Sequence, residues 1–380
     1  MAAGTDAFNC KGENWIVAAC GDGGAVAVTS DLVATSGRNA YGILAQSIGG
    51  GGGWLVGGRL SGNGFFANTA AMSGDGGEIN VSVLEAVRTT GDGAIGVLAQ
   101  SIGGGGLLAG DTAAAGATAS FQSNSDPENN AGNGGMVNVT VASGAAITTG
   151  GANAYGIFAQ SVGGGGGLVT SDAGTVIGTA GGVGTSGPIN IEVDGSVVTT
   201  GAGANAVYID AEGGTASTNP VSLIVKGTVE SGSATNAAHS ILIDSTASSN
   251  TITNYGTIEA VNLSVPAILA TSGPVSLVNQ SISGAPGTII GDVQLRGTVL
   301  SGGTFTNAGL WEPYALSSAS SFTNSGTIWV GHQGLAPHQD FFMAGEPDQY
   351  GNDRDVGRLR PGGRPICCWS GAPPRCRPTA

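Results

Sequence analysis

Two aspartates in consecutive repeats are the residues whose type and spacing best fit chemistry. Asp210 follows Val207-Tyr208-Ile209, and Asp244 follows Ile241-Leu242-Ile243, so each ends the same type of short apolar segment. If the two repeats stack in register, the carboxylates lie one strand spacing apart, about 4.8 Å. Like charges at that distance raise the pKa of one carboxyl group or recruit a cation such as calcium. We therefore consider a weak cation site and an acid–base pair at these positions.

The competing interpretation of both aspartates is a turn role, because Asp at a strand end commonly makes a turn. Leu44, Leu98 and Phe158 occupy the equivalent positions of the earlier repeats in our alignment, so no acidic ladder is expected. No serine–histidine–aspartate set can be assembled around His239, and no Cys/His spacing typical of a metal site occurs. We predict no catalytic residues, no cofactor and no bound metal centre.

The elements that position these residues are internal repeats, which should be sought first in such a chain. Gln46, Gln100 and Gln160 lie in one recurrent motif, Ala-Gln-Ser-Ile/Val followed by a glycine run, at intervals of 54 and 60 residues. The repeats also carry an alternating segment, such as Ile79-Asn80-Val81-Ser82-Val83, and a Thr-rich step, such as Arg88-Thr89-Thr90-Gly91. Later units shorten to a Thr-Asn-x-Gly-Thr-Ile pattern, as at 253–258 and 323–328. Period-2 alternation predicts strands with one buried face.

Three short strands per repeat, with Gly, Asn or Asp at the corners, predict an all-β fold, a right-handed parallel β-helix. The chain contains 71 glycines in 380 residues, but its 41% hydrophobic content is too high for typical disorder. Each coil buries its apolar face only by stacking on its neighbours. A β-sandwich and a disordered chain are the alternatives. The net charge of −14 argues against nucleic acid as a partner.

Glycine-rich insertions follow the same strand in three successive repeats, at 49–73, 103–131 and 163–185. They lack the Lys-Ser or Lys-Thr of a phosphate loop and are interpreted as open corner loops. Because they follow equivalent strands, we expect them to emerge side by side from one edge of the solenoid. Such loops form a binding face or are spacers without a partner. The candidate interaction residues in them are Trp54, Leu55, Phe65, Phe66, Leu107 and Leu108.

The two ends differ from the body. Residues 1–20 are expected to be an N-terminal cap or a truncated start without a signal peptide; Cys10 and Cys20 there either pair or stay free thiols. Residues 21–185 hold the glycine-rich repeats and 186–331 the shorter coils. Residues 332–380 lose the alternation and are rich in Arg, Pro and Cys. That segment is interpreted as a frameshifted sequence or as a genuine disordered tail.

The order of these motifs, glycine blocks first and the Asn-Gly-Thr-Ile ladder later, resembles the passenger regions of bacterial autotransporters over about residues 20–331. The resemblance implies a β-helical passenger at the cell surface or outside the cell. It also implies a secretion signal before the passenger and a C-terminal translocator barrel after it. We expect both to be missing from this chain.

The leading expectation is therefore a non-enzymatic stalk or adhesive passenger whose partner is a host or neighbouring-cell surface through an unknown ligand. The first alternative is a carbohydrate-active enzyme that uses Asp210 and Asp244, since polysaccharide-cleaving β-helices use stacked acidic residues. The second alternative is a truncated product without a function.

Overall fold

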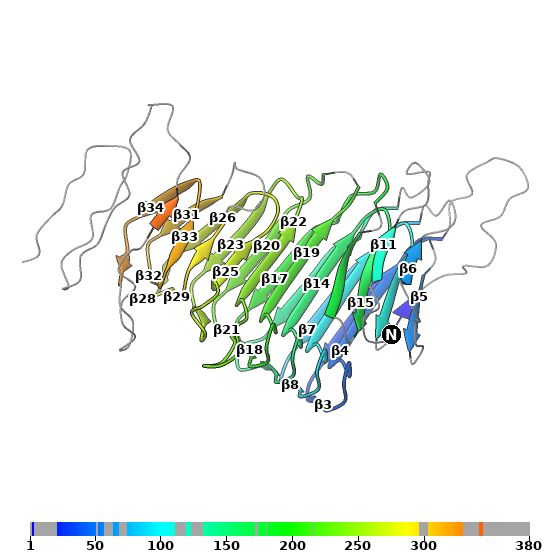
Figure 1. Ribbon diagram of the computed structural model, residues 1–380, viewed down its shortest axis with the longest axis horizontal. Coiled ribbons are helices and arrows are strands. Elements are labelled where there is room, and N and C mark those ends of the chain that lie inside the picture. The colour runs from blue at the N-terminus through cyan, green and yellow to red at the C-terminus, as the bar shows by residue number, and fades with distance from the viewer. Residues whose placement is uncertain are drawn as a thin grey trace, which may run out of the picture.

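The computed structural model describes residues 2–3, 21–50, 52–56, 64–67, 74–110, 119–122, 132–171, 174–179, 181–214, 216–295, 303–329 and 342–344. These residues form an elongated, right-handed parallel β-helix whose coils stack along the long axis (Figure 1). The chain passes through three parallel sheets in turn, and each strand pairs with its counterpart in the next coil. The predicted fold class is confirmed. None of the described residues forms a helix of the length and hydrophobicity needed to cross a membrane.

The strands of each sheet follow one another in chain order. Sheet 1 consists of β2 (Val26–Ser30), β7 (Ile79–Val83), β12 (Val137–Val141), β17 (Ile189–Val193), β20 (Val221–Val225), β23 (Asn250–Asn254), β26 (Val275–Asn279), β31 (Thr304–Asn307) and β34 (Ser321–Asn324). Sheet 2 consists of β3 (Val33–Thr35), β8 (Ala86–Thr89), β13 (Ala146–Thr149), β18 (Ser196–Thr199), β21 (Thr228–Ser231), β24 (Thr257–Ala260), β29 (Thr288–Ile290), β32 (Leu310–Glu312) and β35 (Thr327–Ile328). Sheet 3 consists of β1 (Ala2–Ala3), β4 (Ile43–Ile48), β9 (Val97–Ile102), β14 (Ile157–Val162), β19 (Val207–Glu212), β22 (Ile241–Ser245), β25 (Ile268–Ala270), β30 (Val293–Gln294), β33 (Leu316–Ser318) and β36 (Phe342–Ala344).

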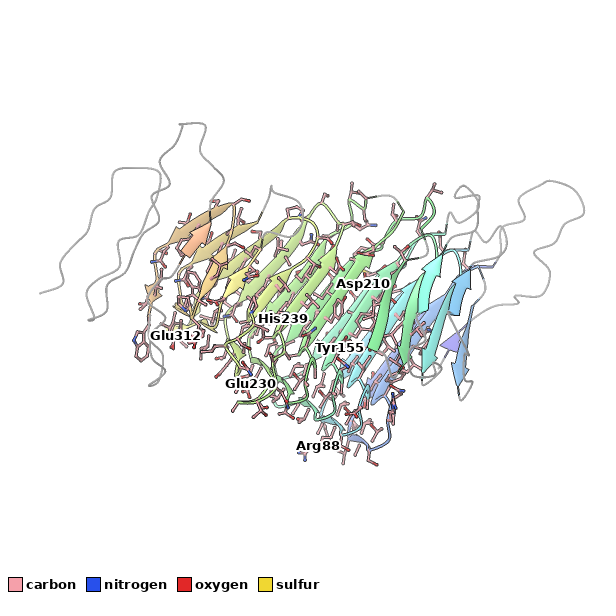
Figure 2. All side chains as sticks on the ribbon, in the orientation of Figure 1. Arg88, Tyr155, Asp210, Glu230, His239 and Glu312 are labelled. Atoms are coloured by element: carbon pink, nitrogen blue, oxygen red, sulfur yellow. The ribbon has the colours of Figure 1, made fainter. Side chains whose placement is uncertain are left out.

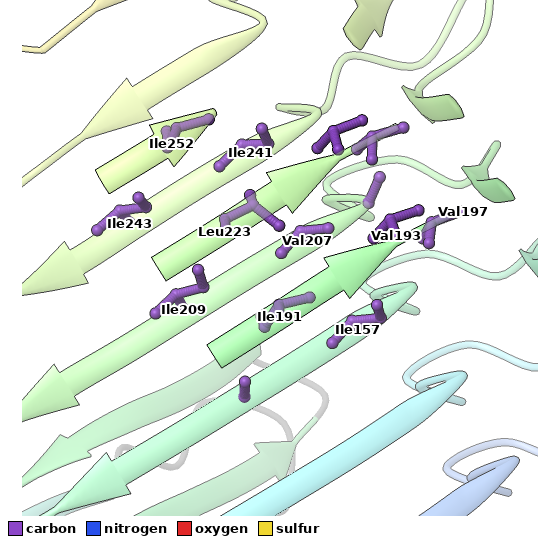
Figure 3. Close-up of a cluster of buried hydrophobic side chains, with 14 of the residues drawn as sticks. Ile157, Ile191, Val193, Val197, Val207, Ile209, Leu223, Ile241, Ile243 and Ile252 are labelled. Carbon is purple, nitrogen blue, oxygen red and sulfur yellow. The ribbon is translucent and has the colours of Figure 1, made fainter. Parts of the chain in front are cut away.

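The inward-facing residues of the three sheets form one continuous core along the solenoid axis. Ile191, Ile209 and Ile243 are typical members, each from a strand with alternating buried and more exposed positions (Figure 3). The core is mostly Val, Ile and Ala, which suit a pleated, closely stacked surface. Because every coil contributes a few such residues, no coil has a core of its own.

Polar ladders inside the stack fix the register between coils. Ser161 illustrates the ladder at the corner before sheet 1: its hydroxyl donates to the carbonyl of Gly135 and accepts from the amide of Gly187, both at 2.8 Å. In the later coils Asn279 accepts from Asn254 at 2.8 Å and donates to Asn307 at 2.7 Å. These buried groups are satisfied only when the coils are aligned, which is the physical basis of the Thr-Asn-x-Gly-Thr-Ile pattern.

A second layer lies outside sheet 3 in the first coils. This outer sheet has the order β16 (Gly174–Thr179), β15 (Gly166–Ser171), β10 (Gly106–Gly110), β5 (Gly52–Val56). A parallel pair, β6 (Gly64–Ala67) with β11 (Ala119–Gln122), and an antiparallel pair, β27 (Ser281–Ile282) with β28 (Ala285–Pro286), complete the elements. The parallel pairing of β5, β10 and β15 places the insertions side by side, as their spacing predicts.

The glycine runs make the turn from sheet 3 into this outer layer. Gly104 and Gly105 have φ angles of +77° and +89°, a left-handed conformation that glycine adopts without strain. A Cβ on Gly163 would lie 2.4 Å from the backbone of Thr185, so no side chain fits there. The interpretation of the runs as open corner loops is wrong for their last residues. Gly52 and Gly53 open β5, and Gly166 and Gly167 open β15, because these positions pair in register with the neighbouring insertions.

Candidate functional site

The two aspartates lie on adjacent strands of sheet 3 and face outward. Asp210 in β19 is the register partner of Asp244 in β22, so the predicted stacking is confirmed. Neither residue ends its strand in a turn: β19 runs on to Glu212 and β22 to Ser245. The predicted turn role is therefore wrong for both, because each lies within a hydrogen-bonded strand.

The alignment with Leu44, Leu98 and Phe158 is also wrong. Leu98 and Phe158 pair in register with each other, and Phe158 pairs with Tyr208 rather than with Asp210. The true counterparts of Asp210 are the motif glutamines Gln46, Gln100 and Gln160. The shift is two residues, which preserves the outward direction of the side chain in a strand. Asp210 thus continues the row of amide side chains, whereas the repeat alignment from the sequence places it in the neighbouring row of apolar side chains.

The three glutamines and Asp210 form a hydrogen-bonded ladder that runs in one direction. The Gln46 Nε2 donates to Gln100 Oε1 at 2.5 Å, and Gln100 donates to Gln160. Gln160 Nε2 then donates to Asp210 Oδ2 at 2.6 Å and to the Gly167 carbonyl of the outer sheet at 3.3 Å. The amide row ends at Asp210, because Asp244 takes the register position in the next coil.

The cover over this ladder is the outer sheet and a second apolar cluster. Leu98, Phe158, Leu108 and Leu168 are fully buried between the two layers. Tyr208 closes the cluster at its far side, with its ring centroid 5.3 Å from that of Phe158. β16, the last strand of the outer sheet, packs beside β19. The covered part of sheet 3 ends at this point.

Three carboxyl groups gather where the cover ends, and we call Asp210, Glu212 and Asp244 the carboxylate step. Asp210 is only 1% exposed, and its Oδ1 accepts no hydrogen bond from the described residues (Figure 2). Burial, followed by the charge of Glu212, raises the pKa of Asp210 well above its ordinary value; the hydrogen bond from Gln160 acts in the opposite direction. An uncompensated charge in such a place is unfavourable, so the protonated acid is favoured.

Glu212 is the member of the carboxylate step that was not predicted from the sequence. Its pKa is raised to about 7 by burial, by the charge of Asp244 and by a hydrogen bond with that carboxyl group. Asp244 in turn accepts a hydrogen bond from the Ser272 hydroxyl. Glu212 lies two residues after Asp210 in a strand, so the same alternation that placed Asp210 outward would have found it. Burial beside Asp244 therefore favours the protonated form of Glu212 up to about neutral pH.

The described residues contain no group of three or more His, Cys, Asp or Glu side chains arranged to hold a metal ion. The carboxylate step thus offers a cation the stacked pair of Asp210 and Asp244 rather than a full oxygen shell. Cation binding there stays a prediction.

The candidate interaction residues lie in the outer layer. Leu108 belongs to β10 and is fully buried, as part of the second apolar cluster between the outer sheet and sheet 3. Trp54 and Leu55 belong to β5, Leu107 to β10, and Phe65 and Phe66 to β6; their side chains, like Cys10 and Cys20, lie outside the described residues. A binding role for these loops stays a prediction.

Comparisons with known proteins add no family. No protein-family model matches the chain, and no curated sequence or solved structure gives a significant match.

Proposed function

We propose that this chain is the non-enzymatic passenger, or stalk, of a bacterial surface protein and makes adhesive contacts with other surfaces. The observation that carries the proposal is the continuous stack itself. The three sheets run through successive coils with one shared core and with buried Ser and Asn ladders that hold the register. Such a stack forms a stiff rod whose faces are repetitive, which suits projection and multivalent contact.

The resemblance to autotransporter passengers supports the same proposal through the order of the motifs. The acidic charge balance, −14 overall, also suits an exported protein kept soluble by repulsion. Under this proposal a secretion signal and a translocator barrel carry the passenger to the cell surface, as the resemblance implies. The partner is a host or neighbouring-cell surface.

The test is adhesion of the full chain. Beads coated with the chain are incubated with cultured cells and with bacterial cells, and the bound beads are counted under flow. Beads coated with the heat-unfolded chain serve as the control. Adhesion by the folded chain above this control supports the proposal, whereas equal adhesion by folded and unfolded chains contradicts it.

A second candidate is a carbohydrate-active enzyme, and the carboxylate step favours it. General acid–base catalysis needs one protonated and one ionised group with pKa values near the working pH. Glu212, whose pKa is raised to about 7, is the candidate general acid of such a pair, and the carboxyl group of Asp244 lies beside it. A screen of polysaccharides for new reducing ends, with Glu212→Gln as the control, tests it. Turnover by the wild type that Glu212→Gln abolishes would replace the adhesive proposal with the enzymatic one.

A further inference from the structure

The outer face of sheet 1 differs from the rest of the surface in its lack of charge. Its outward positions hold a single charged residue, Glu192, which forms an ion pair with Lys226. The chain as a whole carries 26 acidic residues. On sheet 2 the outward row includes Arg88 and Glu230, which lie along one side of the solenoid in Figure 2, and the row continues to the buried Glu312.

The uncharged face is built from two rows that run along the solenoid axis through β20, β23, β26, β31 and β34. Every member of the first row carries a hydroxyl group, and the row consists of Ser222, Thr251, Ser276, Thr304 and Ser321. Every member of the second row is β-branched, and the row consists of Ile224, Thr253, Val278, Thr306 and Thr323. We call these ten residues the hydroxyl face; all of them are at least partly exposed.

The geometry of the hydroxyl face is that of a regular array. Neighbouring members of a row are about 4.8 Å apart, and the two rows are separated by about 6.6 Å, two residues of strand rise. Thr304 Oγ1 donates to Ser276 Oγ at 3.1 Å, so at least these hydroxyls are oriented along the row. A hydroxyl offers one donor and two acceptor positions, so such a chain keeps acceptor capacity for a ligand.

From these observations we infer that the hydroxyl face binds a neutral, unbranched polysaccharide laid along the solenoid axis. Sugar hydroxyls match the first row, because both partners donate and accept. The C–H faces of the sugar rings match the γ-methyl groups of the second row. A chain of identical units presents these groups repeatedly, as the array does, so many weak contacts add along its length.

Charge selects the neutral class of polysaccharide. An acidic glycan would approach a protein of net charge −14 against repulsion. A cationic glycan would find no carboxylate in the two rows to replace the water it loses. A neutral glycan meets neither charge repulsion nor the loss of hydration of a charged group.

The inference deepens the proposed adhesive function and rests on it for its biological setting. Its test uses the full chain in affinity electrophoresis through gels that contain a soluble linear neutral β-glucan, with polygalacturonate gels for comparison. The wild type is expected to be retarded by the β-glucan only, and salt is expected to change the retardation little because no charges pair.

Substitutions locate the binding face. The double variant Thr304→Lys/Thr306→Lys places two charges on the hydroxyl face and is expected to weaken β-glucan binding at least about tenfold. The control Thr257→Lys/Thr288→Lys also adds two charges, on a second outward row of sheet 2 that contains Thr228 and Leu310, and is expected to bind like the wild type. Thr304→Val keeps the β-branched shape and removes only a hydroxyl, so it is expected to give a smaller loss. Circular dichroism melts establish that the variants are folded.

The inference is overturned if the wild type is not retarded by the β-glucan, if both double variants lose binding equally, or if polygalacturonate binds as well. The bead assay separates it from the proposed function. Adhesion that soluble β-glucan does not compete leaves the adhesive role standing and removes the glycan face. Binding of β-glucan by a chain whose beads do not adhere removes the adhesive role and leaves the glycan face.

Discussion

The first and the later coils of this solenoid solve the same packing problem in different ways. In the first coils the glycine insertions fold back over sheet 3. The amide ladder of Gln46, Gln100 and Gln160 is buried there, outside the core of the β-helix. In the later coils none of the described strands covers sheet 3, and the amide ladder of Asn254, Asn279 and Asn307 is buried inside the core. Both ladders align coils, but only the first depends on a second layer.

The difference shows what glycine contributes to each region. The turn into the outer layer needs left-handed backbone and close approach of main chains, which exclude side chains. The later coils need only corner turns, so their glycines are fewer and the units are shorter. The carboxylate step lies where the first arrangement gives way to the second.

The largest effect is expected from a substitution that blocks the turn into the outer layer. Gly164 has a φ angle of +79°, and a Cβ there would lie 2.5 Å from the carbonyl oxygen of Gly181. Gly164→Ala is expected to cost about 3 kcal/mol, from backbone strain and the collision together. The measurement is urea unfolding followed by circular dichroism.

The matched control is Gly144→Ala, because Gly144 has a φ angle of +83° but nothing within 4 Å of the added Cβ. It carries the strain alone and is expected to cost about 1 kcal/mol. Equal losses in the two variants would show that the tight approach of the outer layer does not contribute.

The interior ladder of the later coils is tested by Asn279→Leu, a replacement of similar volume. Asn279 is fully buried and its amide also donates to the Leu310 carbonyl at 3.0 Å. The variant leaves the Oδ1 of Asn307 without its donor and is expected to cost about 2 kcal/mol.

The control for the ladder is Asn138→Leu on the outward face of sheet 1. Asn138 donates to Asn80 at 2.8 Å and accepts from Asn190 at 2.9 Å, but water replaces both contacts there. The expected change is within about 0.5 kcal/mol. A loss as large as that of Asn279→Leu would contradict the idea that burial, rather than the amide row itself, sets the contribution.

The sequence predicts much of the fold because the strand signal lies in side chains. Ile79, Val81 and Val83 alternate with polar residues and are the buried positions of β7. The outer sheet escapes prediction because the first residues of its strands are glycines, which have no side chain to show a period. The Asp210 alignment failed because Ile209-Asp210-Ala211 replaces the Ala-Gln-Ser motif just where the glycine run is lost. Cover and burial, which make Asp210 and Glu212 unusual acids, depend on that unpredicted layer.

The smallest expected effect is a pH dependence confined to the carboxylate step. The folded-state pKa of Glu212, about 7, lies above the ordinary 4.5, so protonation stabilises the folded chain. This contribution is fully present below about pH 4.5 and is lost as the pH rises through about 7. Asp210, whose pKa is also raised, acts in the same direction. The opposite sign, loss of stability on acidification, is usual for carboxylates paired with bases.

Glu212→Gln isolates this contribution because an amide keeps the shape and carries no charge at any pH. Its melting temperature is expected to exceed that of the wild type at pH 8, where the wild-type Glu212 is ionised beside Asp244, and to approach it below about pH 4.5, where Glu212 is protonated in the folded and the unfolded chain alike. Melts recorded between about pH 4 and pH 8 give the difference curve, which should rise between about pH 4.5 and pH 7 and level off above that range. The same variant of Glu230, a partly exposed acid on sheet 2 that pairs in register with Glu259, is the control. A flat difference curve for Glu212→Gln would contradict this prediction. It would show that burial at the end of the outer layer does not keep Glu212 protonated, and that the boundary between the two regions carries no unfavourable charge.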